Sequence, residues 1–242
     1  MTYCVAVKVD EGLICLSDTR TNAGLDNISR YKKMFTWTNP GERAITLMTA
    51  GNLAITQGVM SLLQENIDKD NGVETLYTAP SMFRVAEIVG DAMRIVQERY
   101  GPGLSQRGEA SDASIICAGQ RAGGPLRLFL IYAAGNFIEA TSDTPFFQIG
   151  EHKYGKPILD RVITPETSLT DATKAALLSM DSTLRSNLSV GMPLDLTVLP
   201  TNAYAFAHER RIEAEDLGFQ NLSERWSDAL RDAFVTIPDL LA

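Results

Sequence analysis

The amino-acid sequence predicts an α+β protein that folds as a four-layer αββα sandwich, with residues 1–242 in one domain. The predicted elements come in pairs along the chain, in the order β-β, α-α, β-β, α-α, β-β. Hairpin strands separated from helices in this way pack as two stacked sheets with helices outside them. The first two strands are apolar on both faces, which is typical of sheets that are covered on both sides. No Pro- or Ser-rich linker divides the chain.

The first two strands are predicted to form a β-hairpin. Tyr3–Val9 and Leu13–Ser17 are rich in Val, Ile and Cys, and Asp10-Glu11-Gly12 separates them. A three-residue loop that ends in glycine is a common hairpin connection, because glycine accepts the left-handed conformation. This loop sets the register of the pair and places Asp18 on the same sheet face as Thr2, one diagonal step away.

The later strands follow from apolar runs bounded by turn residues, and the helices from a 3.6-residue period with capping residues. A polar turn is expected from Thr19 to Ser29, and the polar, Gly-rich stretch from Gly101 to Asp112 is the best candidate for a mobile loop. Further strands are predicted at Lys33–Trp37, Ala44–Thr49, Ser114–Ala118, Leu126–Tyr132, Phe137–Ala140, Phe147–Ile149, Leu194–Leu199 and Ala203–Ala207. Helices are predicted from Asn52 to a stop at Asn71-Gly72, from Pro80 or Ser81 through Tyr100, and over Tyr154–Val162, Thr170–Leu188 and Ser223–Phe234.

Composition and charge argue against several classes of protein. A net charge of −8 and a pI near 4.9 repel phosphate backbones, so no nucleic-acid partner is expected. No apolar stretch reaches the roughly 18–20 residues of a spanning helix, so no membrane partner is expected. The N-terminus lacks a basic region followed by an apolar one, which predicts a cytoplasmic product. The 3 cysteines and 2 histidines match no metal-site spacing. Neither a metal nor an organic cofactor is expected, and the cysteines are expected to be reduced core residues.

Thr2 becomes the first residue once Met1 is removed, and this position suits a nucleophile. A hydroxyl needs a base at neutral pH, and the free α-amine of the same residue can serve, directly or through a water. The unperturbed pKa of that amine is about 7.7–8.0, close to working pH. A lysine beside the threonine lowers the pKa of its hydroxyl and amine, and a carboxylate keeps the lysine charged. Position alone also fits an ordinary strand residue, and Asp18 alone fits a turn residue.

The run TYCVAVKVDEGLICLSDTRTNAG, followed by RYKKMF, resembles the start of proteasome β-subunits and of the bacterial HslV peptidase. The chain resembles the Anbu family, the bacterial ancestral β-subunit homologues of the proteasome, along nearly its whole length. This likeness includes Thr49–Gly51 and Tyr132–Gly135. The resemblance implies the fold of N-terminal-nucleophile hydrolases, with Thr2 as nucleophile and Asp18 and Lys33 as its catalytic partners.

The resemblance also implies further site residues, and the sequence departs from the family at several of them. Met48 falls at the glycine whose backbone N–H forms the oxyanion hole, and a backbone donor survives this change. Glu151 replaces a serine of a Gly-Ser-Gly turn, where its carboxylate disfavours a second anion. Ser186 and Ser189 match an Asp-x-x-Ser motif of the active site, so the charge of the aspartate is lost. Both serines also fit ordinary polar residues in the last helical turn before Gly191.

The leading hypothesis is a self-assembling threonine peptidase or amidohydrolase of proteasome type, acting on a peptide or amide substrate. The resemblance implies a homo-oligomeric ring or open spiral and leaves any unfoldase partner unknown. Two alternatives stay open. The changes at Met48, Glu151 and Ser186 fit a self-assembling, peptide-binding scaffold without turnover. A narrow pocket shaped by the loop from Gly101 to Asp112 fits an acylase that cleaves small amides.

Overall fold

A computed structural model describes residues 2–22, 28–69 and 72–238, which form an α+β fold with antiparallel sheets. The strands are β1 (Tyr3–Val9), β2 (Gly12–Asp18), β3 (Arg20–Asn22), β4 (Ile28–Arg30), β5 (Met34–Asn39), β6 (Arg43–Gly51), β7 (Ala113–Arg121), β8 (Arg127–Ile131), β9 (Phe137–Glu139), β10 (Phe146–Gly150), β11 (Leu194–Pro200) and β12 (His208–Ile212). The helices are α1 (Leu53–Asp68), α2 (Met82–Gln106), α3 (Lys156–Val162), α4 (Leu169–Ser186) and α5 (Leu217–Thr236).

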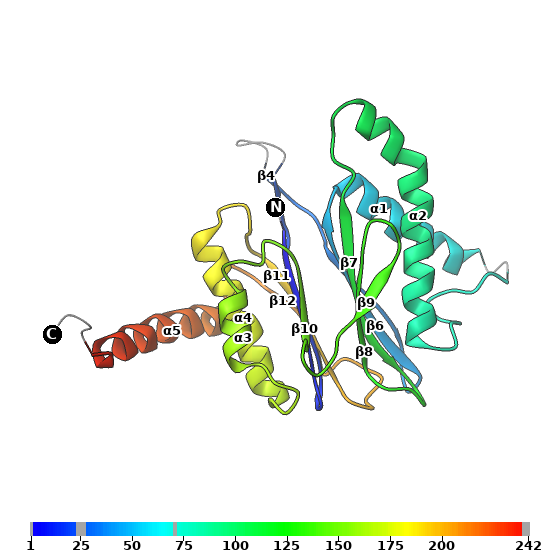
Figure 1. Ribbon diagram of the computed structural model, residues 1–242. Helices are drawn as coiled ribbons and strands as arrows, with labels where there is room; N and C mark the ends of the chain where they lie inside the picture. The colour runs from blue at the N-terminus through cyan, green and yellow to red at the C-terminus, as the bar shows by residue number, and fades with distance from the viewer. Residues whose placement is uncertain (1, 23–27, 70–71, 239–242) are drawn as a thin grey trace.

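Most of these strands lie in two 5-stranded sheets, with the orders β10-β1-β2-β11-β12 and β5-β6-β7-β8-β9. Strand β1 pairs with β10 on one side and with β2 on the other. The head of β1, where Thr2 lies, is therefore held from both sides within the first sheet. Figure 1 shows this end of β1 beside the two-stranded ribbon β3-β4, which rises above the first sheet.

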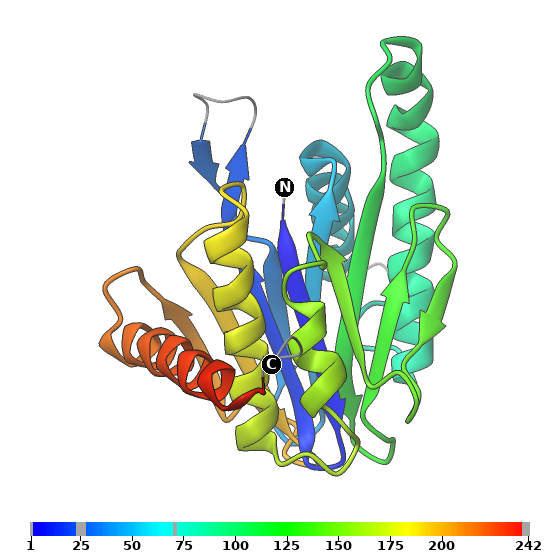
Figure 2. The same ribbon diagram turned by 60° about the vertical axis from the view of Figure 1, so that its left-hand side comes forward.

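Three clusters of buried hydrophobic residues hold the layers together. One lies between α1, α2 and the sheet β5–β9, and a second lies between α3, α4 and the sheet that contains β1. The third lies between the two sheets and includes Cys4, Met48 and Ile116. Figures 1 and 2 show the two helix pairs beside their own sheets. Each fully buried Leu, Ile or Val side chain stabilises such a core by roughly 1.5–3 kcal/mol.

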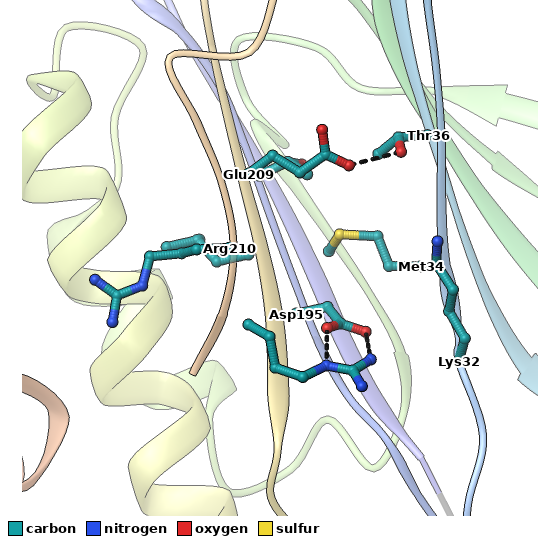
Figure 3. A pocket seen from close by; sticks show the side chains of 9 residues that line it. Lys32, Met34, Thr36, Asp195, Glu209 and Arg210 are labelled. Atoms are coloured by element: carbon teal, nitrogen blue, oxygen red, sulfur yellow. Dashed lines mark hydrogen bonds and ion pairs between the residues drawn. The ribbon is translucent and has the colours of Figure 1, made fainter. Parts of the chain in front are cut away.

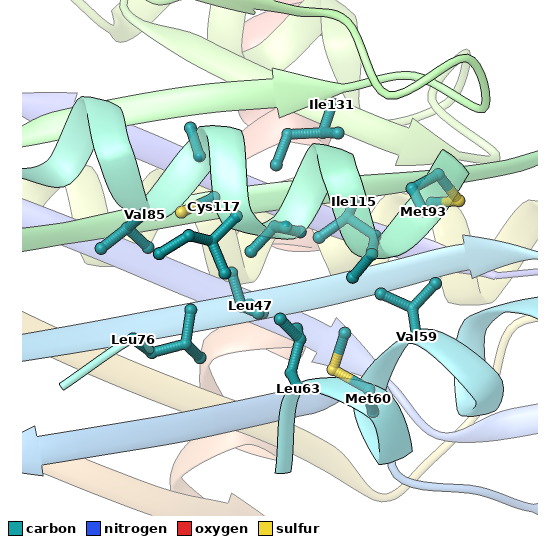
Figure 4. Packing of buried hydrophobic residues seen from close by; sticks show 14 of the residues in the cluster. Leu47, Val59, Met60, Leu63, Leu76, Val85, Met93, Ile115, Cys117 and Ile131 are labelled. Atoms are coloured by element: carbon teal, nitrogen blue, oxygen red, sulfur yellow. The ribbon is translucent and has the colours of Figure 1, made fainter. Parts of the chain in front are cut away.

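The cluster under α1 and α2 follows from alternation along β6 and β7. Leu47 of β6 and Ile115 of β7 turn toward these helices, whereas their neighbours Met48 and Ile116 belong to the cluster between the sheets. Figure 4 shows Leu47 and Ile115 packed against the apolar side chains of the two helices. The helices begin where the sequence predicts, because Asn52 caps α1 and Ser81 caps α2 with their side-chain oxygens.

The N-terminal hairpin forms, but its loop has two residues rather than the predicted three. Val9 pairs with Gly12, so only residues 10 and 11 make the loop. A Cβ atom at Gly12 would lie 2.5 Å from the carbonyl oxygen of Leu199. The glycine is thus required by the close approach of β11 and not by a left-handed turn. The register shifts by one residue, so Asp18 stands opposite Tyr3 and the predicted diagonal pairing with Thr2 was wrong.

Several element boundaries also differ from the prediction. The last strand is β12 at His208–Ile212, not Ala203–Ala207, because Asn202 and Tyr204 adopt positive φ angles of 63° and 52° and break the strand there. Helix α2 continues through Pro102 to Gln106, so the first half of the predicted loop from Gly101 to Asp112 is helical. The predicted turn at 19–29 contributes β3 and β4, and its residues 23–27 lie outside the described residues, as does Asn71 of the predicted helix stop.

Helix α5 is covered far less than the rest of the fold. None of its 20 residues is buried, and Figure 1 shows it projecting away from the sheets toward the C-terminus. Its link to α4 is polar: the Ser223 hydroxyl donates to Asp181 Oδ1 (2.6 Å), and Arg185 donates to the Ser223 oxygen (2.7 Å). Among the described residues, no helix is long and apolar enough to cross a membrane.

Candidate functional site

A cavity of about 500 Å³ opens at the head of β1. Thr2 contributes to its wall and is itself buried, with 9% of its surface exposed. The walls come from β1, from the start of β5, from the junction of β6 with α1, and from the end of β10. The lining residues are Thr2, Thr21, Lys33, Thr49, Ala50, Gly51, Leu53, Thr56, Gly150 and Glu151.

Lys33 lines this cavity, and the fully buried Asp18 pairs with it from behind the wall. Lys33 Nζ donates to Asp18 Oδ1 (2.7 Å) and to the carbonyl oxygen of Arg20 (2.5 Å). Asp18 also accepts the backbone N–H of Tyr3 (3.0 Å) and, at Oδ2, that of Gly191 (3.2 Å). The ammonium group carries three N–H donors, so one is left for a group in the cavity. Although the register prediction was wrong, the structure brings Asp18 and Lys33 together next to Thr2.

Both charges of this pair are buried, since the side chains of Asp18 and Lys33 are 0% and 4% exposed. Burial raises the pKa of the Asp18 carboxyl, and the Lys33 ammonium and the N–H groups of Tyr3 and Gly191 oppose that rise. Three donors, one of them the Lys33 cation, favour the charged form of this carboxyl. Asp18 therefore holds the Lys33 ammonium group in a fixed position in the wall of the cavity that Thr2 lines.

Met48 does not supply a donor to the cavity. Thr49 N–H donates across to Lys33 O (2.9 Å) on the β5 side, and Asn52 N–H donates to Asp112 O (2.8 Å) on the β7 side. Amide directions alternate along a strand, so Met48 N–H is used in the ladder with β7. Its side chain is fully buried between the sheets. The expectation that Met48 borders the site is corrected by this geometry.

Gly51 takes the place that was expected for Met48. By the same alternation its N–H points to the β5 side, beyond the point where β5 begins. Gly51 lines the cavity and has a φ of +104°, and a Cβ atom there would lie 2.2 Å from Asp112 O. Only glycine fits this bend. The run Thr49–Gly51 was noticed in the sequence, but its glycine was not predicted as a site residue.

Glu151 meets Thr2 across the strand pair β1–β10. Its N–H donates to Thr2 O (2.6 Å), and both residues line the cavity. The Glu151 carboxylate accepts from Asn187 Nδ2 (3.1 Å). Asn187 is the C-cap of α4 and was not predicted as a site residue. Its signal in the sequence was its place between Ser186 and Ser189.

The structure does not bring Ser186 or Ser189 into the cavity wall. Ser186 is the last residue of α4 and is exposed. Ser189 contributes its backbone N–H to Asn187 Oδ1 (2.9 Å). In this geometry the polar contact between the end of α4 and the cavity is made by Asn187 and Glu151, not by either serine.

Tyr3 anchors the residue next to Thr2. Its hydroxyl lies 2.5 Å from Ser179 Oγ on α4 and accepts from Gln148 Nε2 (2.6 Å) on β10. Burial raises the pKa of Tyr3 to about 12, so the hydroxyl stays protonated. The backbone next to Thr2 is thereby held by α4 as well as by β2 and β10.

A second cavity, of about 210 Å³, lies at the edge of the molecule between β5 and the pair β11–β12 (Figure 3). Its charges are mostly paired, because Arg211 binds Asp195 through two N–H groups (2.8 and 3.0 Å) and Glu209 accepts from Thr36 (2.7 Å). No three His, Cys, Asp or Glu side chains of the described residues gather to hold a metal ion. The three cysteines are buried free thiols, and burial raises the pKa of each.

The comparisons with known proteins agree with this geometry. No family model and no curated protein matches the chain. Among solved structures, an Anbu (Gly-1) mutant from Hyphomicrobium sp. strain MC1 is 52% identical, with 99% of each chain covered and a TM-score of 0.92. Anbu (ancestral β-subunit) from Yersinia bercovieri is 44% identical over 98% of each chain, with a TM-score of 0.92. The helical assembly of the Anbu complex from Pseudomonas aeruginosa is 44% identical over 98% of this chain and 97% of that one, also with a TM-score of 0.92. The chain therefore belongs to the Anbu family of proteasome-related proteins.

Proposed function

We propose that this protein is a self-assembling N-terminal threonine hydrolase of proteasome type. The single observation that carries the proposal is Lys33, which lines the same cavity as Thr2 and is paired with the buried Asp18 at 2.7 Å. An ion pair withdrawn from water costs free energy unless it is well hydrogen-bonded, and this one holds its cation in the wall that Thr2 also lines. Such an arrangement suits the activation of a nucleophile.

In the proposed reaction Thr2 Oγ1 attacks the carbonyl carbon of an amide bond. The α-amine of Thr2 takes the hydroxyl proton and later returns it to the leaving amine, and water then releases the acyl group. Lys33 stabilises the negative charge that develops on Thr2 Oγ1 as the hydroxyl proton leaves, and Asp18 holds Lys33 in place. The backbone N–H of Gly51 is proposed as the oxyanion donor, since such donors are commonly worth 10²–10³ in rate.

We also propose that the chain is a single domain with four layers. Three separate hydrophobic clusters support the αββα sandwich, and the cluster between the sheets supports one domain over residues 1–242. The cytoplasmic location and a peptide or small-amide substrate stay predictions. The acylase alternative loses part of its basis, because the first half of the proposed pocket loop is the end of helix α2.

Self-association is proposed to proceed through uncovered helix surface. The relative from Pseudomonas aeruginosa forms a helical assembly. In this chain α5 leaves large apolar side chains exposed, among them Leu217 at 78%, Phe234 at 77% and Val235 at 82%. This surface also supports the alternative of a scaffold that assembles without turnover. Assembly and catalysis are therefore tested separately.

The decisive test combines intact mass with active-site labelling. Purified protein is expected to lack Met1 and to gain the mass of one epoxyketone, a reagent that needs both the hydroxyl and the amine of an N-terminal threonine. Thr2→Ala should abolish labelling, whereas Thr19→Ala, which removes a nearby hydroxyl that bonds to Pro193 O (2.8 Å), should not. Equal hydrolysis of peptides, esters and small amides by wild type and Thr2→Ala would sink the enzymatic proposal and leave the scaffold.

A further inference from the structure

Glu151 is the charged residue of the Thr2 cavity that lacks an oppositely charged partner among the described residues. The other charged residue of the wall, Lys33, is neutralised by Asp18 at 2.7 Å. Glu151 has only the neutral amide of Asn187 on its carboxylate, at 3.1 Å. A carboxylate in a partly buried wall is costly without a counter-charge, so the site is built to receive a cation.

Asn187 fixes the direction of this carboxylate. Its Oδ1 accepts Ser189 N–H (2.9 Å), which leaves its Nδ2 to donate to Glu151. Its own N–H continues α4 by donating to Thr183 O (2.9 Å). Because both ends of the Asn187 side chain are in use, the Glu151 side chain is held rather than free to turn into solvent.

The end of α4 makes a cation still more favourable there. The C-terminus of a helix carries a partial negative charge, which disfavours a carboxylate beside it. The cations around the site are already engaged: Lys33 binds Asp18 and Arg20 O, and the Arg20 guanidinium donates to Leu188 O (2.8 Å). The His152 ring lies against Gly150 O (3.3 Å).

We propose that Glu151, held by Asn187, is a positioning residue that binds the α-ammonium group of Thr2. One step beyond the last β1–β10 pair, Tyr3 and Gly150, the Glu151 N–H donates to Thr2 O (2.6 Å). This bond holds the two residues side by side, and both line the same cavity. The inference rests on the proposed function in one respect: Thr2 must begin the mature chain.

The consequence is a balance of opposing charges on the amine that is proposed as the base. Glu151 favours its charged form and raises its pKa, whereas Lys33 lowers it. Asp18 shields Lys33, Arg20 and His152 face backbone oxygens, and α1 contributes only Leu53 and Thr56 to the wall. Glu151 therefore orients the amine and sets the pH at which it becomes a base.

The test measures the amine directly and needs no turnover. The rate at which the Thr2 amine is acetylated by trace anhydride is followed by mass spectrometry between about pH 6 and 10, around the usual pKa of 7.7–8.0. Glu151→Gln is expected to lower the apparent pKa of the amine by roughly one pH unit. Asn187→Ala should shift it in the same direction by less, and Glu151→Asp should restore part of the wild-type value. The matched control is Glu215→Gln, which removes an exposed carboxylate outside the cavity.

The possible results separate this inference from the proposed function. A lowered amine pKa in Glu151→Gln without any hydrolysis by wild type supports the inference and defeats only the enzymatic proposal. An unchanged amine pKa in Glu151→Gln overturns the inference. This holds also if that variant raises KM only for substrates with a basic side chain, because Glu151 would then bind the substrate and not the Thr2 amine. A retained Met1 overturns both, because Thr2 then has no amine. A circular-dichroism spectrum matching wild type shows that each variant is folded.

Discussion

The strands that carry Thr2 and Asp18 differ from helix α5 in how completely the chain covers them. All seven residues of β2 are buried, and Tyr3 and Cys4 at the start of β1 are fully inaccessible. Not one of the 20 residues of α5 is buried. The polar groups differ in the same way. Asp18 receives three N–H donors within the core, whereas α5 is joined to α4 by Ser223, Asp181 and Arg185 near the surface.

This difference separates the region of the proposed active site from the region of the proposed association surface. The strand ends are organised by contacts within a single copy, so the candidate site can form in an isolated subunit. Helix α5 lacks the apolar burial that usually stabilises a helix, so its surface is suited to contact with another molecule. Substitutions in the first region should change stability and chemistry together, and substitutions of the exposed apolar residues of α5 should change association alone.

The largest effect is expected from breaking the buried ion pair. Lys33→Met leaves the Asp18 carboxylate buried without its cation, which should lower the free energy of unfolding by roughly 3–5 kcal/mol. Urea unfolding measures this loss. The double variant Asp18→Asn with Lys33→Met removes both charges and should recover most of the stability but none of the epoxyketone labelling. If the single and double variants have the same free energy of unfolding, the loss of stability does not come from an unpaired buried charge on Asp18.

The next effect concerns alkaline pH and the residue beside Thr2. Burial raises the pKa of Tyr3 from 10.0 to about 12, so folding favours the protonated hydroxyl. That stabilisation is fully present below pH 10 and is lost as the pH rises toward 12. It amounts to roughly 2–3 kcal/mol. The difference in unfolding free energy between wild type and Tyr3→Phe should shrink by this amount across that range. A constant difference from pH 9 to 12 would contradict the assignment.

Removing apolar groups from α5 tests whether this helix takes part in self-association. Phe234→Ser with Val235→Ser removes two side chains that are 77% and 82% exposed. If they are buried between copies, self-association should weaken by about 10- to 100-fold in sedimentation experiments. The unfolding free energy of the monomer should change by less than about 0.5 kcal/mol, as is usual for surface positions. Glu224→Gln on the same helix is the control. Unaltered sedimentation would remove α5 from the interface.

The smallest effect is expected at the polar contact between α4 and α5. Ser223→Ala deletes the hydroxyl that bridges Asp181 and Arg185 and should cost about 1 kcal/mol. Because α5 has no buried residue, this cost should appear as faster hydrogen exchange in α5 and not in β1 or β2. Faster exchange in both regions would show that the two are coupled after all.

The sequence predicted the order of strands and helices well where apolar patterns and caps agree, as at Asn52 and Ser81. It failed where a residue has a role that only packing reveals. Gly12 was interpreted as a turn residue, but it admits the backbone of β11. Strand β12 was missed because its side chains are charged and mostly exposed, which removes the alternation on which strand prediction depends.

The candidate site shows the same division. Thr2, Asp18 and Lys33 were identified from a resemblance over the chain, and the structure places the latter two in contact. The choice of Met48 failed because sequence does not show which way an amide points, and amide direction decides between Met48 and Gly51. Asn187 was missed because its partner, Glu151, is brought to it only by the packing of α4 on the first sheet.

The position of β1 within its sheet also sets the time at which the site can exist during synthesis. Its neighbour β10 ends at Gly150, and Asp18 receives its last donor from Gly191. A nascent chain carries Thr2 from the start, yet the ribosome must deliver about four fifths of the polypeptide, up to Gly191, before the proposed nucleophile acquires its surroundings. Long-range pairings of this kind form late because the intervening loop must first be closed. An unfinished chain therefore lacks the proposed reactive centre, because the groups that surround Thr2 have not yet been synthesised.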